Sequence, residues 1–150
     1  MTQISNDAEF RAALDGLDAT RQRLVGARFV ENVLALCSDD RIAHVLQVAG
    51  NSEASEGELA EALKTAKATT FDCHTRCGSE GDWTEQEGYF VARAAVAALT
   101  PAGKMPSGPA WQAALSSRMA QTSRSIVTGD DTAGQEGNQQ YRILSEFLDS

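Results

Sequence analysis

The side chains best suited to chemistry lie together in one short stretch, Cys73-His74-Thr75-Arg76-Cys77. On a helix, residues three or four positions apart face each other, so Cys77 could share a zinc ion with Cys73 or with His74. A thiolate beside an imidazole can also act as a nucleophile, and His74 and Cys77 have the spacing for that pairing. The stretch therefore raises two hypotheses, a metal site and a thiol-based enzyme.

The spacing of the cysteines favours packing over chemistry. Cys73 and Cys77 continue an apolar stripe that steps by four and three residues through Leu59, Leu63, Ala66 and Thr70. Buried cysteines that serve as small hydrophobic side chains occupy such positions. A metal site would need Cys37 or His44 as a further ligand, and the chain lacks the paired Cys-x-x-Cys units typical of structural zinc. We therefore expect no catalytic residue, no metal ligand and no cofactor.

Apolar residues recur at helical spacing along most of the chain. Only 6% of the residues are aromatic, and alanine, the best helix former and a poor strand former, fills much of the apolar share. Capping-box patterns begin helices at Asn6, Ser55 and Thr84, and Pro109 suits the first turn of another. The expected helices cover about residues 6–16, 21–37, 38–50, 55–77, 84–99, 109–126 and 141–150. The sequence predicts an all-α fold, a single compact array of six to seven helices in antiparallel pairs.

The expected organisation is a helical domain at residues 1–128, a flexible acidic linker at 129–140 and a short amphipathic helix at 141–150. The linker has no apolar side chain larger than alanine, which is typical of flexible segments. After it, one apolar stripe is formed by Tyr141, Leu144, Phe147 and Leu148. This helix is too short to be stable alone. Its stripe either packs back on the helical domain or docks in the groove of a partner.

The charge of the chain favours a protein partner. The formal net charge is -8, which argues against nucleic acid and anionic membranes, because both require a basic surface. Many acidic residues lie at expected helix starts, where they complement the helix dipole. Among them, Glu85 and Glu87 could also form a docking patch for a basic protein. The first residues lack the features of a signal peptide, so we expect a cytoplasmic protein with reduced thiols.

Four segments resemble a family of small bacterial helical proteins. They read GARFVENVL at 26–34, DDRI at 39–42, LKTAKATTFDCH at 63–74 and VARAAVAA at 91–98. The pattern is similar to that of the Imm5-like group of immunity proteins, over about residues 20–100. It departs from that group at Cys73 and Cys77 and in the acidic tail. The resemblance implies an all-helical, non-catalytic protein that binds and neutralises a partner, and no binding residues carry over from it.

These observations together favour a non-catalytic protein-binding module, an immunity-like or adaptor protein. Its expected contacts are an acidic helical surface that includes Glu85 and Glu87, and the C-terminal stripe. The expected partner has a basic or apolar docking surface. Two alternatives stay open. One is a metal-binding or thiol-based enzyme at Cys73, His74 and Cys77. The other is a small-molecule sensor with a pocket between the helices at 21–37, 55–77 and 84–99, where the sequence offers no polar cluster.

Overall fold

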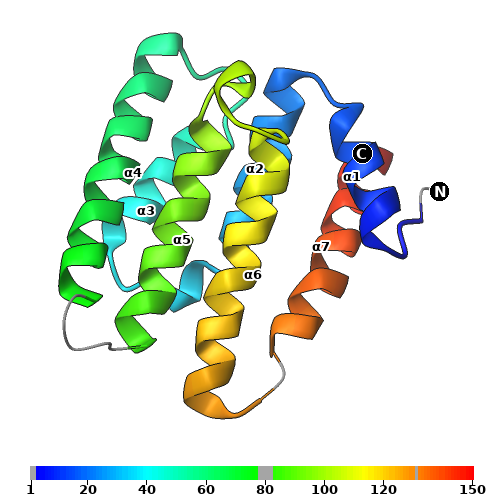
Figure 1. Ribbon diagram of the computed structural model, residues 1–150. Coiled ribbons are helices and arrows are strands. Elements are labelled where there is room, and N and C mark those ends of the chain that lie inside the picture. Colours follow the sequence, from blue (N-terminus) through cyan, green and yellow to red (C-terminus); the bar gives the residue numbers. More distant parts are fainter. Residues whose placement is uncertain (1–2, 78–82, 131) are drawn as a thin grey trace.

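A computed structural model shows the chain as a bundle of α-helices (Figure 1). It describes residues 3–77, 83–130 and 132–150, without the side chains of residues 76, 77, 83–85, 132 and 133. The described residues form seven α-helices and no β-strand, so the predicted all-α fold is confirmed. The helices are α1 (Asp7–Asp15), α2 (Ala19–Glu31), α3 (Asp40–Ala49), α4 (Glu56–Cys77), α5 (Trp83–Leu99), α6 (Pro109–Thr128) and α7 (Thr132–Asp149). Two short 3-10 helices, η1 (Leu34–Leu36) and η2 (Ala102–Lys104), lie in the connections.

Polar side chains cap the first turns of several helices. Asn6 accepts a hydrogen bond from the backbone N–H of Glu9 at 2.9 Å, which begins α1. At the start of α4, the hydroxyl of Ser55 accepts from the N–H of Glu58 at 3.1 Å, and the Glu58 carboxylate accepts from the N–H of Ser55 at 3.0 Å. This reciprocal pair is the capping box that the sequence predicts, and it satisfies two backbone donors that the helix itself leaves unpaired.

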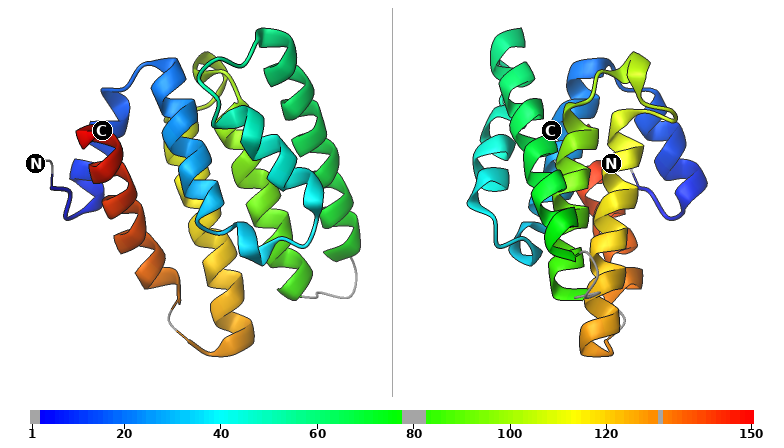
Figure 2. Two further views of the ribbon diagram at one scale, coloured as in Figure 1. Left: turned by 180° about the vertical axis from the view of Figure 1, so that it is seen from behind. Right: turned by 60° about the vertical axis from the view of Figure 1, so that its left-hand side comes forward.

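The helices pack in antiparallel neighbours, as predicted. α4, α5 and α6 stand side by side in Figure 1, and each runs opposite to the one before it. Figure 2 shows α2 and α3 on the other face of this row. α2 contacts α3, α5, α6 and α7, whereas α7 packs against α2 and α6, and α1 lies against α6. α2, α5 and α6 together therefore form the centre of the bundle.

Alanine builds much of the core and allows the helices to approach closely. Five buried alanines lie on α5: Ala92, Ala94, Ala95, Ala97 and Ala98. On α2, a Cβ added at Gly26 would stand 3.2 Å from the Cβ of Ala98 and 3.7 Å from the Cα of Ala110. The backbones of α2, α5 and α6 therefore meet with almost no side chain between them.

Larger side chains fill a second cluster where α1, α2, α6 and α7 meet. Phe10 is fully buried at its centre. Its ring centroid lies 5.5 Å from that of Phe29, 6.0 Å from Trp111 and 5.4 Å from Tyr141. These tilted contacts are the arrangement that aromatic rings prefer. The C-terminal helix therefore supplies part of the core.

The second helix is shorter than the sequence predicts. Its apolar pattern predicts a helix over residues 21–37, but α2 ends at Glu31 and residues 34–36 form η1. The next residue, Asn32, donates from its side-chain amide to both carboxylate oxygens of Glu136, each at 3.0 Å. That partner is 104 residues away, so the sequence could not indicate this contact at the end of α2.

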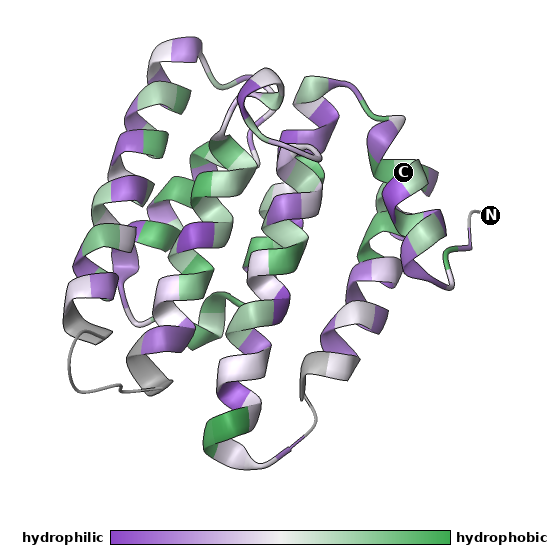
Figure 3. Cartoon of the chain, in the orientation of Figure 1, coloured by the Kyte–Doolittle hydropathy of each residue, from purple (hydrophilic) through white to green (hydrophobic). Residues whose placement is uncertain are grey.

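The C-terminal helix is longer than the sequence predicts. A flexible linker is predicted for residues 129–140, whereas α7 begins at Thr132. Figure 3 shows that α7 is hydrophobic mainly in its later part, so polar contacts must hold its first half. Gln140 is fully buried, donates to the carbonyl of Ala114 at 2.9 Å and accepts from Arg118 at 2.8 Å. The linker prediction is wrong for residues 132–140 because it considered only apolar anchors.

None of the helices in the described part of the chain is both long enough and apolar enough to span a membrane.

Candidate functional site

The cysteine and histidine stretch lies in the last turns of α4. Cys73 is 1% exposed and belongs to the core. His74 is exposed, and its ring centroid lies 5.5 Å from that of Tyr89 on α5. The side chain of Cys77 lies outside the described residues, and with it the expected pairing of Cys77 with His74. Cys73 thus packs as a small hydrophobic side chain, as its place on the apolar stripe predicts.

The other residues named for a metal site lie on different elements. Cys37 follows η1, where its Sγ lies 3.9 Å from the carbonyl oxygen of Asp39, and His44 is exposed on α3. Among the residues that the structure describes, no three or more His, Cys, Asp or Glu side chains are grouped so that they could hold a metal ion. The metal and thiol hypotheses, which depend on Cys77, stay predictions.

Of the two acidic residues proposed for docking at the start of α5, the structure describes the side chain of Glu87. The side chain of Glu85 lies outside the described residues. Glu87 is only 2% exposed, and its Oε1 lies 3.7 Å from Nη1 of Arg124 on α6. The expectation that Glu87 contributes to an exposed acidic surface is wrong, because α5 turns this side chain toward α6.

The C-terminal stripe packs within the protein. Leu144 is fully buried and Phe147 is 6% exposed. Tyr141 and Leu148 are half-buried against the same cluster. Of the two alternatives for this stripe, the structure shows packing on its own domain. Leu144 and Phe147 are therefore covered and unavailable to a partner while α7 is docked.

A polar contact joins α7 to α1 and α6. Arg118 donates to the two carboxylate oxygens of Asp7 at 3.0 and 2.9 Å, and the Tyr141 hydroxyl donates to Asp7 at 2.7 Å. The hydrogen bonds from Arg118 lower the pKa of Asp7. The guanidinium of Arg118 also lies 5.6 Å from the ring centroids of Phe10 and Trp111, within the range of a cation–π contact. This cluster therefore has a structural role.

An apolar groove with a volume of about 440 Å³ lies between α3 and α4, and we call it the α3–α4 groove. Its lining includes the apolar Val45, Val48 and Ala62 and the exposed His44, Glu58 and Glu61. The capping hydrogen bonds from Ser55 lower the pKa of Glu58, so this carboxylate stays charged. The groove thus combines an apolar floor with acidic edges.

A salt bridge holds the two walls of the α3–α4 groove. Arg41, at the start of α3, donates to Asp39 at 2.7 Å and to Asp72 of α4 at 2.9 Å. The hydrogen bonds to Asp39 and Asp72 raise the pKa of Arg41. Because α3 and α4 form an antiparallel hairpin, this bridge fixes the end of the pair opposite to the connecting loop at residues 50–55.

A second hollow, which we call the apical cavity, is lined by helix ends that lie at the top of Figure 1. Its volume is about 490 Å³, and its walls come from α2, α4, α5, residues 100–102 and the first residue of α6. Most of the lining is apolar and includes Leu59, Leu63, Leu99 and Pro109. The cavity lies between the three helices for which the sequence raised a small-molecule pocket.

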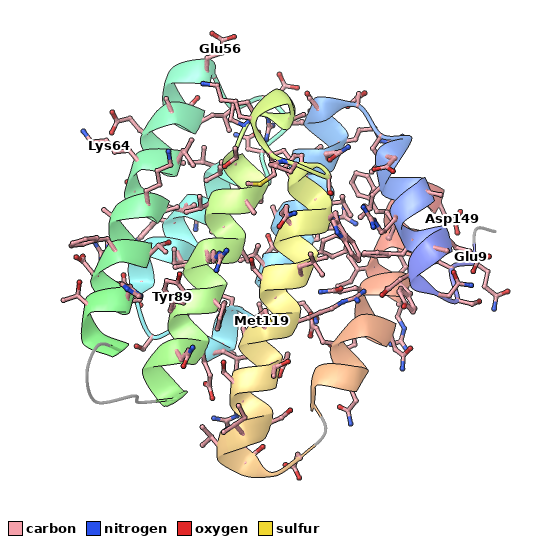
Figure 4. All side chains as sticks on the ribbon, in the orientation of Figure 1. Glu9, Glu56, Lys64, Tyr89, Met119 and Asp149 are labelled. Atoms are coloured by element: carbon pink, nitrogen blue, oxygen red, sulfur yellow. The ribbon has the colours of Figure 1, made fainter. Side chains whose placement is uncertain are left out.

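Two charged residues, Arg23 and Glu56, line the apical cavity. Nε of Arg23 donates to the carbonyl of Ala49 at 3.0 Å, and Nη2 donates to the carbonyl of Asn51 at 2.8 Å. Within the described part of the chain, Arg23 forms no salt bridge with a carboxylate. Figure 4 shows Glu56 at the outer tip of α4, where its side chain points away from the bundle.

Sequence reasoning did not single out Arg23 as a site residue. Its position carried a signal, because Arg23 precedes Ala27 by four residues and Val30 by seven, and so continues the buried stripe of α2. An arginine on such a stripe is expected to donate hydrogen bonds to the end of a neighbouring helix or to face a hollow. Arg23 does both.

With the geometry established, we compared the chain with protein family models, curated proteins and solved structures, and none of them matches it. The functional interpretation therefore depends on the sites themselves.

Proposed function

We propose that the protein is a non-catalytic binding module that recognises a protein partner through the α3–α4 groove. The observation that supports this proposal is an apolar floor bordered by carboxylates in one place. Val48 offers contact area to an apolar side chain, with the nearly buried Val45 and Ala62 also in the lining, while Glu58 and Glu61 stand exposed beside them. Interfaces commonly combine such an apolar centre with a charged edge.

The chemistry of the groove defines the partner that fits it. An apolar side chain would enter between α3 and α4, and Lys or Arg residues on either side of it would face Glu58 and Glu61. The chain as a whole carries a net charge of -8, so its field attracts a basic segment over longer distances as well. The carboxylates would then mainly accelerate association and select the partner, and the apolar contact would supply most of the affinity.

The proposed function belongs to the class that the sequence predicts, but the proposed contact surface is a different one. The acidic surface is on α4 instead of the start of α5, and the C-terminal stripe takes no part in it. An immunity-like or adaptor role, as the resemblance implies, remains compatible with such a groove because neither role needs a catalytic residue.

Peptide display on the immobilised full chain tests the proposal. We expect the selected peptides to share an apolar residue with Lys or Arg within a few positions. Chemical-shift mapping of the strongest synthetic peptide should perturb Val45, Val48 and Ala62. The affinity should fall as the salt concentration rises, since the edge charges are exposed.

A matched pair of charge reversals makes this test specific. Glu61→Lys alters the edge of the groove, and Glu146→Lys makes the same change at an exposed position of α7. The first should weaken peptide binding by about tenfold or more, because a like charge would face the basic residues, and the second should leave it nearly unchanged. Equal losses in both variants, or selected peptides without basic residues, would contradict the proposal.

A further inference from the structure

The apical cavity has the size and lining of a small-molecule site. Its volume is about 490 Å³, within the range of about 300–1,000 Å³ that is typical of ligand pockets. Leucine, alanine and proline side chains from four helices and residues 100–102 form most of its wall. Such a wall favours the alkyl or aromatic part of a ligand.

Arg23 indicates which polar group a ligand of this cavity would carry. Two of the five N–H donors of its guanidinium are used by carbonyl oxygens, at 3.0 and 2.8 Å. These bonds hold the guanidinium in place without neutralising its charge. A half-buried cation beside an apolar hollow favours an anionic group, and a carboxylate matches the planar donors of arginine.

The backbone around the cavity contributes partial charges of both signs. The first turn of α2 at Ala19 and Thr20 and the first residue of α6, Pro109, line the cavity. The N-terminal end of a helix carries partial positive charge, but Asp18 already caps that of α2, and the C-terminal end of α5 at Leu99, which also lines the cavity, carries partial negative charge. The carboxylate of Glu56, which would oppose an anion, points away from the bundle in Figure 4.

We propose that the apical cavity binds a small amphiphilic carboxylate, with its carboxylate on Arg23 and its apolar tail between α4 and α5. This site is separate from the α3–α4 groove, because the two hollows lie on different sides of α4 and share no lining residue. A failure of either proposal therefore leaves the other intact.

Calorimetric titration of the full chain with three probes of equal chain length tests the head group. Octanoate, octanol and octylammonium are used below the concentrations at which they self-associate. We expect octanoate to bind saturably at one site per chain, about tenfold or more tighter than octylammonium and measurably tighter than octanol. From hexanoate to octanoate, the affinity should rise by up to about fourfold per methylene, as the tail fills the cavity.

Two tryptophan substitutions on α4 locate the binding. Ala60 lines the cavity and Ala68 does not, and both are exposed, so neither variant threatens the fold. Ala60→Trp should abolish octanoate binding, whereas Ala68→Trp should retain it. Arg23→Gln, checked for folding by circular dichroism, should reduce the affinity for octanoate to that for octanol.

Specific results would overturn the proposal. If octylammonium or octanol binds as tightly as octanoate, Arg23 does not select the head group. If octanoate binds equally well to the Ala60→Trp variant, it binds elsewhere on the protein. If none of the three probes binds saturably, the cavity is not a site for this class of ligand.

Discussion

At the scale of single residues, Glu136 is a carboxylic acid enclosed by amides. It is 1% exposed, and both of its oxygens accept hydrogen bonds from Asn32 at 3.0 Å, with Gln121 at 3.4 Å. Burial raises its pKa from the ordinary value of 4.5, against the smaller opposite effect of these hydrogen bonds and of the Arg118 charge. The folded protein therefore binds this proton more tightly than the unfolded chain does.

That shift predicts a pH-dependent contribution to stability. The contribution of Glu136 is fully present below pH 4.5 and is lost as the pH rises through the raised pKa. Glu136→Gln does not titrate and keeps an acceptor for Asn32. The free energy of unfolding of this variant, relative to that of the original chain, should therefore increase as the pH rises above 4.5, so that the variant becomes relatively more stable.

Urea denaturation over a series of pH values measures this difference. Glu146→Gln, at an exposed position of the same helix, is the control and should not reproduce the trend. If the difference in unfolding free energy between the Glu136→Gln variant and the original chain stays constant between pH 4.5 and about pH 8, the pKa of Glu136 is not raised in the folded protein.

At the scale of elements, the close approach of α2 to α5 and α6 depends on Gly26. A larger side chain there would meet Ala98 at 3.2 Å and the backbone at Ala110. Gly26→Leu should destabilise the protein by at least about 1–3 kcal/mol, because three packed helices would have to separate. The melting temperature should fall by about 2–4 °C for each kcal/mol.

Gly103→Leu is the matched control for this prediction. A Cβ at Gly103 meets no atom within 4 Å, so the same added side chain has open space. Thermal unfolding followed by circular dichroism compares the two variants. A Gly26→Leu protein as stable as the Gly103→Leu protein would mean that α2 does not pack as closely as the structure shows.

At the scale of the whole molecule, α7 covers the aromatic cluster around Phe10. Ending the chain at Thr128 removes Leu144 and Phe147 and exposes Phe10 and Phe29. Replacing one such leucine by alanine typically costs about 2–5 kcal/mol. Loss of the entire helix should therefore cost more than Leu144→Ala, and should leave a partly unfolded protein.

Chemical denaturation and binding of a hydrophobic dye measure this outcome. Compared with the full chain and the Leu144→Ala variant, the truncated form should unfold at the lowest denaturant concentration and bind the most dye. Equal stability of the full and truncated chains would mean that α7 docks only weakly. The C-terminal stripe would then be available to bind a partner.

The sequence by itself determined the class of fold and most helix starts. The capping box at Ser55 and Glu58, the proline at position 109 and the period of the apolar residues are local signals, because each acts within about one turn of helix. The same patterns also allowed the hypothesis of a hollow between α2, α4 and α5.

Only the tertiary structure decided where polar side chains lie. Glu87 and Glu136 look like solvated residues of acidic segments, yet both are buried, and Asn32 at the end of α2 donates to Glu136, a residue 104 positions away. The same holds for Arg23, whose partners are carbonyl groups at the end of α3. A buried polar group is stable only with a partner, and partners that are distant in sequence come together only when the helices pack.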